Sequence, residues 1–213
     1  ASLFRATNPK AVRELYQAMY DEVKDRVEHK IAGINGEEKY RLTFIGLPPW
    51  HSLGFFDKLA ERGWNFVTEQ AYHPPRPIDL STVSDPVERL VRYRFQGLTH
   101  LIDEEFEPEE AEEIKQEIRQ NGYASRLIAR VVKEFQCDAA FLHPLLTCRT
   151  ATAGLFAFQH QIMEVWKVPS IVVEGDIVDL RLFDPADALK KAEAFEETMD
   201  HYKKVRREAG LEW

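Results

Sequence analysis

The sequence predicts an α/β fold, a parallel sheet of about four strands with helices on both faces. Short β-rich runs alternate with longer helical patterns, an order typical of parallel strands joined by helical crossovers. Two of the runs, residues 139–142 and 171–173, are apolar at every position, as strands covered on both faces need to be. Glycine and proline punctuate the boundaries between the runs.

The first predicted element is a helix over residues 11–31, which Asn8 caps and Pro9 opens as the first helical residue. Its apolar residues recur every four positions and form one stripe: Leu15, Met19, Val23 and Val27. A polar, glycine-containing loop follows over residues 33–39. We therefore divide the chain into an N-terminal helix with its linker, residues 1–39, and an α/β domain, residues 40–213.

The remaining elements follow from the change of pattern at residue 40. The predicted strands cover residues 40–45, 64–68, 137–142 and 168–173. The predicted helices cover residues 53–62, 86–94, 108–119, 123–135, 150–166 and 187–207. Gly63 is placed as a C-cap, and the proline-rich residues 72–85 predict an irregular excursion over the rim of the sheet. Together these elements predict a three-layer sandwich of the flavodoxin or Rossmann kind.

Composition and charge exclude several classes of protein. Lys and Arg number 28 against 36 Asp and Glu, so the net charge is −8, and no dense basic stripe is present to bind nucleic acid. No apolar run approaches the roughly 20 residues that span a bilayer, and no secretory leader is visible. The only two cysteines cannot form a disulfide framework, which favours a cytoplasmic location. The chain begins with Ala1, so we expect a processed product or a piece of a longer protein.

Ligands in open parallel sheets bind beyond the carboxyl ends of the strands. This rule marks four loops: residues 47–53, 70–74, 143–152 and 174–181. In the third loop, Cys148 lies just before a predicted helix, whose dipole would favour a thiolate together with Arg149. Such a thiolate could be a nucleophile, a redox thiol or a metal ligand, and the structural alternative is a small buried cysteine at a helix start. His143 and Thr147 lie in the same loop.

For the other candidate residues, the sequence gives a structural role at least as much support as a catalytic or binding role. Cys137 opens an apolar strand and is best interpreted as a core residue. Since a mononuclear or iron–sulfur site needs about four ligands, two cysteines do not make a cysteine-only site. Glu174 and Asp176 could act as acid, base or cation ligand, or could cap the next turn, whereas Asp179 and Arg181 favour a structural pair. The chain contains neither a P-loop nor a GxGxxG, GxSxG or HExxH motif.

The order of these features resembles the carboxyl-terminal part of the benzoyl-CoA reductase and 2-hydroxyacyl-CoA dehydratase D-component family. The residues that carry the resemblance are Gly46-Leu47-Pro48-Pro49-Trp50, Tyr72-His73-Pro74, Cys137-Asp138, His143, Thr147-Cys148-Arg149, Gln159, Val168-Pro169 and the run from Glu174 to Arg181. Residues 137–181 are the most specific stretch, and residues 46–74 support it.

The resemblance implies an enzyme that holds a [4Fe–4S] cluster, is reduced by an ATP-dependent activator protein, pairs with a homologous second subunit and acts on an acyl-CoA or aromatic CoA thioester. It places Cys148 as a cluster ligand, with Thr147 and Arg149 beside the cluster. Trp50, His51 and His143 are the catalytic, substrate-facing candidates. The family's other cluster cysteines lie in an amino-terminal domain, which we expect to be missing here.

Within the family, residues 148–149 and 176–181 favour a benzoyl-CoA reductase, which reduces an aromatic thioester ring. The alternative is a 2-hydroxyacyl-CoA dehydratase, which removes water through a ketyl radical. Two hypotheses from other classes remain open. One is a module that binds CoA or a partner without chemistry of its own. The other is a thiol redox protein that uses Cys148 alone, which the lack of a nearby resolving cysteine disfavours.

Overall fold

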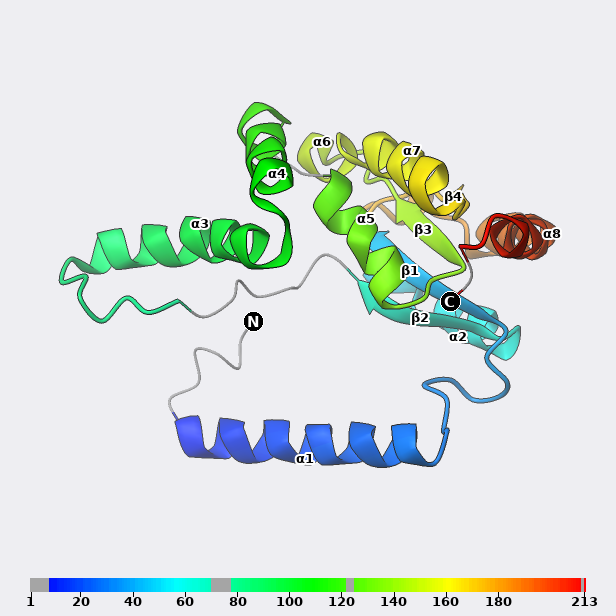
Figure 1. Cartoon of the computed structure of the whole chain (residues 1–213). Coiled ribbons are helices and arrows are strands. Elements are labelled where there is room, and N and C mark those ends of the chain that lie inside the picture. Colours follow the sequence, from blue (N-terminus) through cyan, green and yellow to red (C-terminus); the bar gives the residue numbers. More distant parts are fainter. Residues whose placement is uncertain (1–7, 70–77, 122–124, 212) are drawn as a thin grey trace.

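The computed structural model describes residues 8–69, 78–121, 125–211 and 213. Its centre is a sheet of four parallel strands in the order β2-β1-β3-β4 (Figure 1). The strands are β1 (Tyr40–Gly46), β2 (Trp64–Glu69), β3 (Ala139–His143) and β4 (Ser170–Val172). The fold class predicted from the sequence is confirmed.

Helices cover both faces of the sheet, because the central strands are apolar on both sides. Successive residues of a strand point to opposite faces, so Phe141 joins one core cluster and Leu142 the other. The first cluster packs under α2 (Gly54–Glu61) and α8 (Pro185–Glu208), and the second under α5 (Ser125–Glu134) and α7 (Leu155–Trp166). The result is a three-layer sandwich in which the loops after each strand emerge at one edge.

Two helices form a smaller unit beside the sandwich. α3 (Pro86–Glu105) and α4 (Pro108–Asn121) share a core of Ile102, Ala111 and Ile114. The sequence predicted that the first of these helices ends at residue 94, which is wrong. The contact of Ile102 with α4 extends the helix beyond the point where its sequence pattern fades.

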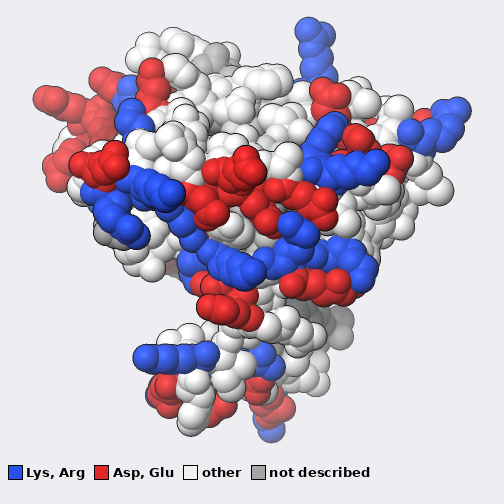
Figure 2. All heavy atoms as spheres, turned by 90° about the vertical axis from the view of Figure 1, so that its right-hand side faces the viewer, with Lys and Arg blue, Asp and Glu red and all other residues white. Residues whose placement is uncertain are grey.

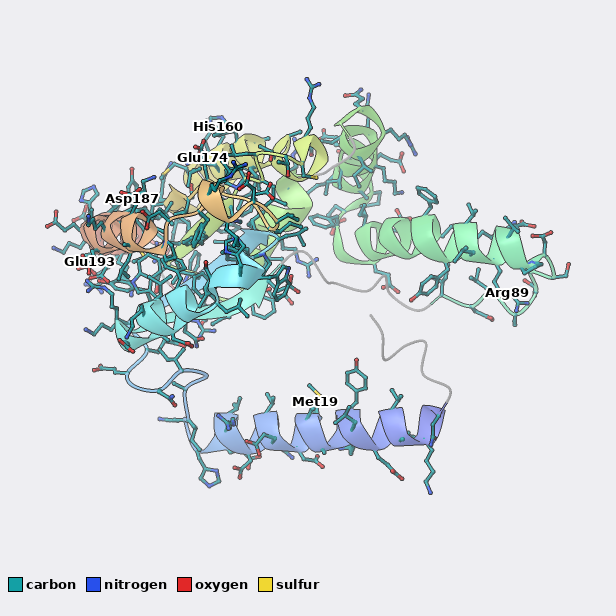
Figure 3. The ribbon with its side chains drawn as sticks, turned by 180° about the vertical axis from the view of Figure 1, so that it is seen from behind. Met19, Arg89, His160, Glu174, Asp187 and Glu193 are labelled. Atoms are coloured by element: carbon teal, nitrogen blue, oxygen red, sulfur yellow. The ribbon has the colours of Figure 1, made fainter. Side chains whose placement is uncertain are left out.

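The N-terminal helix α1 (Pro9–Glu28) lies apart from the sheet (Figure 1). As predicted, Pro9 is its first residue, and Asn8 caps it by accepting a hydrogen bond from the backbone of Ala11 at 3.2 Å. The predicted apolar stripe lies on this helix and is exposed, and Figure 3 shows Met19 projecting from it. The domain boundary between residues 39 and 40 stays a prediction.

The single helix predicted over residues 150–166 is two helices, α6 (Arg149–Thr152) and α7. The chain turns at Ala153 and Gly154, and the Thr152 hydroxyl donates to the carbonyls of Leu145 (3.0 Å) and Cys148 (3.1 Å). Two short 3₁₀ turns, Trp50–Ser52 and Leu180–Leu182, interrupt the loops after β1 and β4. The predicted ligand loop at residues 70–74 lies outside the described residues.

The outer face of α8 carries acidic and basic side chains side by side (Figure 2). Arg62 joins this helix to α2 through ion pairs with Glu196 (2.8 Å) and Glu193 (3.1 Å). Near the other end of α8, the buried Arg206 pairs with Asp138 at 2.8 Å. Among the described residues, no helix is long and apolar enough to cross a bilayer.

Candidate functional site at the carboxyl ends of the strands

The direction of the crossover connections changes between β1 and β3, at whose carboxyl ends open α/β sheets bind ligands. The chain leaves β1 toward β2 and later returns to β3 on the opposite side of β1, so the loops after β1 and β3 diverge. Gly46 ends β1 with φ +120°, and a Cβ there would lie 2.5 Å from the carbonyl oxygen of His143. Only glycine therefore allows the two strand ends to approach so closely.

Main-chain hydrogen bonds join the loops after β3 and β4. The Leu146 amide donates to the carbonyl of Gly175 at 3.0 Å, and the Gly175 amide donates to the carbonyl of Pro144 at 3.2 Å. A Cβ on residue 175 would lie 2.6 Å from Cε1 of His143, so glycine at this position makes room for the imidazole. This steric role of Gly175 was not predicted from the sequence, although a glycine just beyond a predicted strand is a visible signal of close approach.

His143 is fully buried and is held as a neutral acceptor. Its Nδ1–H donates to the carbonyl of Val173 at 2.6 Å, and this bond assigns the proton to Nδ1 because a carbonyl can only accept. Nε2 then carries a lone pair and has no hydrogen-bond partner among the described residues. Burial lowers the pKa of His143, although the Val173 carbonyl and the Asp176 carboxylate oppose this shift. Phe44 and Phe183 contact the ring, with centroids at 6.2 and 5.7 Å.

The loop after β1 brings His51 to the same edge. Its Nε2–H donates to the carbonyl of Asp176 at 3.0 Å, and Nδ1 lies 2.8 Å from the Ser52 hydroxyl. Its ring lies edge-on to Phe183, with centroids 6.1 Å apart. Trp50, the other candidate in this loop, is half exposed.

Asp176 is a buried carboxylate that the sequence analysis left open between chemistry and structure. One oxygen accepts hydrogen bonds from the amides of Val178 (2.8 Å) and Asp179 (3.1 Å), and the other accepts a short hydrogen bond from the Thr147 hydroxyl. These bonds, the one from Thr147 foremost, lower the pKa of Asp176 to about 2. Glu174, in contrast, is exposed.

Asp179 and Arg181 form the structural pair that the sequence favoured. The Arg181 Nε donates to Asp179 at 2.8 Å, and the same carboxylate accepts the Arg181 amide at 3.1 Å to cap a 3₁₀ turn. Neither contact reaches the buried groups of the site.

Cys148 is partly buried in the loop after β3, and Arg149 beside it is exposed. The Cys148 amide donates to the carbonyl of Leu145 at 3.0 Å, which closes a turn just before α6. Because α6 has only four residues, the dipole that the sequence analysis invoked for the thiolate is that of a single turn.

Cys137 differs from Cys148 in its position in the sheet and in its burial. It precedes β3 and so lies at the amino edge of the sheet, with no exposed surface. Burial raises the pKa of its thiol to about 12. Within the described part of the chain, no group of three or more His, Cys, Asp and Glu side chains could hold a metal ion.

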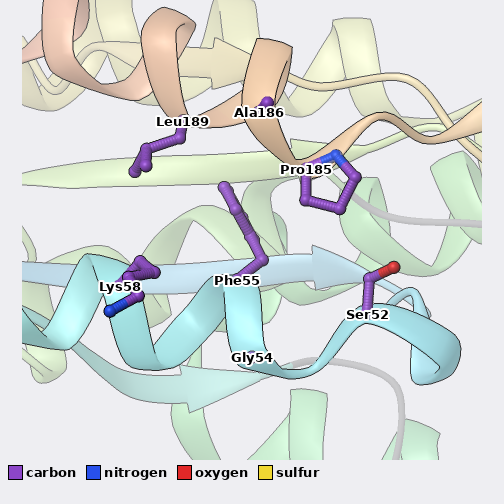
Figure 4. A pocket seen from close by; sticks show the side chains of 7 residues that line it. All are labelled: Ser52, Gly54, Phe55, Lys58, Pro185, Ala186 and Leu189. Carbon is purple, nitrogen blue, oxygen red and sulfur yellow. The ribbon is translucent and has the colours of Figure 1, made fainter.

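An apolar cleft of about 410 Å³ opens beside the site, between the first turns of α2 and α8 (Figure 4). Its lining is Ser52, Gly54, Phe55, Lys58, Pro185, Ala186 and Leu189. Phe55 connects the cleft to the site, because its ring contacts Phe183 with centroids 5.6 Å apart. The sequence analysis missed this cleft, since the pattern along one segment does not show which two helices lie side by side.

Comparisons with known proteins give one family model and two curated relatives that the chain is similar to. Residues 1–199 match the model of the family described as 2-hydroxyglutaryl-CoA dehydratase, D-component. The chain is 23% identical over 216 residues to the (R)-2-hydroxyisocaproyl-CoA dehydratase alpha subunit of Clostridioides difficile, covering 95% of this chain and 45% of that protein. It is 23% identical over 206 residues to a benzoyl-CoA reductase subunit of Thauera aromatica, covering 88% and 41%. The chain thus spans less than half the length of these curated relatives.

Proposed function

The chain belongs to the 2-hydroxyglutaryl-CoA dehydratase D-component family, and from this premise we propose that it forms part of an iron–sulfur enzyme that transforms CoA thioesters in the cytoplasm. The observation that carries the proposal is that the partly buried Cys148 and the buried acceptor of His143 lie at the same edge of the sheet. Both lie within the matched residues.

Two reactions are compatible with this family. We propose a benzoyl-CoA reductase-like reduction of an aromatic ring, which the residues around Cys148 and the run from Asp176 to Arg181 favour in the sequence. The alternative is elimination of water from a 2-hydroxyacyl-CoA. The relatives named for these two reactions are equally identical to the chain at 23%, so identity favours neither.

The residues of this chain fit one ligand position of a [4Fe–4S] cluster and not a whole site. Cys148 is available at the carboxyl edge, whereas Cys137 is buried beyond the amino end of β3. Because a cluster needs about four ligands, the others would come from outside these 213 residues, from further chain or from a homologous second subunit. When bound, such a cluster supplies low-potential electrons, which in this proposal an ATP-dependent activator delivers.

The chain's own residues would bind and orient the thioester. Nε2 of His143 offers an acceptor in an aromatic surrounding that excludes water, suited to a hydroxyl or amide donor of the substrate. His51 and Trp50 would contact the substrate from the loop after β1, and Thr147 and Arg149 would flank the cluster ligand. The apolar cleft between α2 and α8 has the size and lining to take an acyl or pantetheine segment.

The test is the iron and acid-labile sulfide content of the protein purified anaerobically from its own host with its partners. We expect Cys148→Ser to lose the cluster and Cys137→Ser to keep it. Equal iron in the two variants would overturn the assignment of Cys148.

Turnover of the same preparation, supplied with reductant and activator, separates the reactions. Loss of the aromatic absorbance of benzoyl-CoA supports the reductase, and an enoyl-CoA product from a 2-hydroxyacyl-CoA supports the dehydratase. Binding of CoA thioesters without iron in either variant would indicate a binding module instead.

A further inference from the structure

We propose that Asp176 is a positioning residue, which fixes the Thr147–Cys148 segment against His51 by joining the loops after three strands. The inference rests on the proposed function, because a fixed position of Cys148 matters if this residue is a cluster ligand. The hydrogen bonds from which it is argued all lie within this chain.

Every polar atom of Asp176 that can accept a hydrogen bond is used. One carboxylate oxygen holds its own loop after β4, through the amides of Val178 and Asp179. The other accepts the Thr147 hydroxyl from the loop after β3, and the main-chain carbonyl accepts Nε2–H of His51 from the loop after β1. The three loops are far apart in sequence, and Asp176 bonds to all of them, in addition to the main-chain hydrogen bonds that join the loops after β3 and β4.

The chemistry of this residue argues against a packing role. A carboxylate that is 1% exposed loses the solvation of its charge, a cost that an apolar residue would avoid. Here the cost is offset by bonds to loops and not by contacts with the core. Thr147 is exposed, so its hydroxyl could bond to water, and its bond to Asp176 serves to hold the segment.

The bond from Thr147 adds a side-chain restraint to the turn that the Cys148 amide closes with the carbonyl of Leu145. Before Cys148, the side chain of Thr147 is anchored to Asp176, and after it, the hydroxyl of Thr152 donates to the carbonyls of Leu145 and Cys148. Cys148 is therefore held from both sides, although α6 is only one turn long. Without Asp176, the restraint nearer to His51 would be lost.

The test measures the alkylation rate of Cys148 by iodoacetamide in the metal-free 213-residue chain, quantified on the Cys148 peptide. Thr147→Val removes the anchoring bond, and Asp176→Asn weakens it by replacing the charged acceptor with an amide. We expect Thr147→Val to raise the rate about fivefold, the factor that one lost hydrogen bond gives a local opening equilibrium, and Asp176→Asn to raise it by a smaller factor. Thr147→Ser keeps the hydroxyl and should restore the wild-type rate.

The matched control is Asp179→Asn, which alters the same loop but breaks only the exposed pair with Arg181. It should leave the alkylation rate unchanged. The imidazole ¹⁵N shifts of His51 provide a second readout, and Asp176→Asn should move them while Asp179→Asn does not.

Two results would overturn the inference: a wild-type rate in Thr147→Val, or equal effects of Asp176→Asn and Asp179→Asn. Thr147→Val keeps the test decisive if Asp176→Asn fails to fold, because residue 147 is exposed. Since no metal is present, failure here is separate from failure of the cluster assignment, which the iron content decides.

Discussion

Alkylation of the native chain should modify one of its two cysteines and spare the other. Cys148 is partly exposed, and Cys137 is fully buried with a thiol whose pKa burial raises to about 12. At pH 8, such a thiol is about one ten-thousandth thiolate, whereas an ordinary thiol with a pKa near 8.5 is roughly one quarter thiolate. The difference in thiolate alone slows Cys137 about 2,000-fold relative to an ordinary thiol.

Burial adds a second barrier, because iodoacetamide cannot reach a side chain with no exposed surface. Cys137 should therefore react only when the second core cluster opens, and its rate should follow global unfolding. Peptide mass spectrometry after timed quenching measures both sites in one sample. In urea above the unfolding midpoint, both cysteines should react at the same rate, which controls for sequence effects on reactivity.

Comparable labelling of Cys137 and Cys148 in the native state would refute this reasoning. It would mean that the core around β3 is open to reagent, and the choice of Cys148 as the chemically available thiol would lose its basis. Labelling of Cys148 alone would leave it as the one thiol of this chain that can reach a cluster, a substrate or an oxidant.

Three further perturbations address other parts of the structure. Arg206→Met leaves Asp138 buried beside one remaining cation, so the free energy of unfolding in urea should fall by about 3 kcal/mol, the lower end for a broken buried pair. Gly175→Ala drives a Cβ into the His143 ring and should cost about 1–3 kcal/mol while shifting the imidazole NMR signals, and unchanged signals would contradict the packing. Burial and Asp200 raise the pKa of Tyr40 to about 12. The stability that this shift adds is complete below about pH 10 and is lost as the pH rises toward 12, so the wild-type advantage in urea midpoint over Tyr40→Phe should shrink across that window.

The sheet could be predicted because its strands are short, apolar on both faces and bounded by glycine and proline. Its helices were harder to delimit, since their ends depend on contacts that no local pattern contains. The break between α6 and α7 comes with bonds from the Thr152 hydroxyl back to the carbonyls of Leu145 and Cys148 in the preceding turn, and the extension of α3 depends on Ile102 meeting α4. A side-chain bond within the loop accompanies the first boundary and a tertiary contact the second, and the pattern of apolar residues shows neither.

The site, like the fold, could be predicted only in part from the sequence. The rule that ligands bind beyond strand ends selected the loops containing His51, His143 and Cys148, and the structure brings the first two together around Phe183. The partners within the site could not be predicted. They depend on the register that sets Gly46 beside His143 and on the bridge between Leu145 and Gly175, and both arise only when the sheet assembles. The roles of these residues in catalysis stay predictions.

An unpaired buried atom does not by itself identify a functional residue in this chain. The hydroxyls of Thr43 and Ser170 are also buried without a hydrogen-bond partner among the described residues, yet both belong to strands of the sheet. His143 differs from them in three ways that reinforce each other. It ends its strand at the carboxyl edge where the crossover direction changes between β1 and β3, its ring is accommodated by a glycine at position 175, and its Nδ1 bond forces the free lone pair onto Nε2. Leaving such an acceptor unpaired costs about 1–3 kcal/mol, which an apolar residue at the end of β3 would avoid. The cost is understandable if a ligand supplies the missing donor, and this is why we place His143 before Trp50 among the candidates.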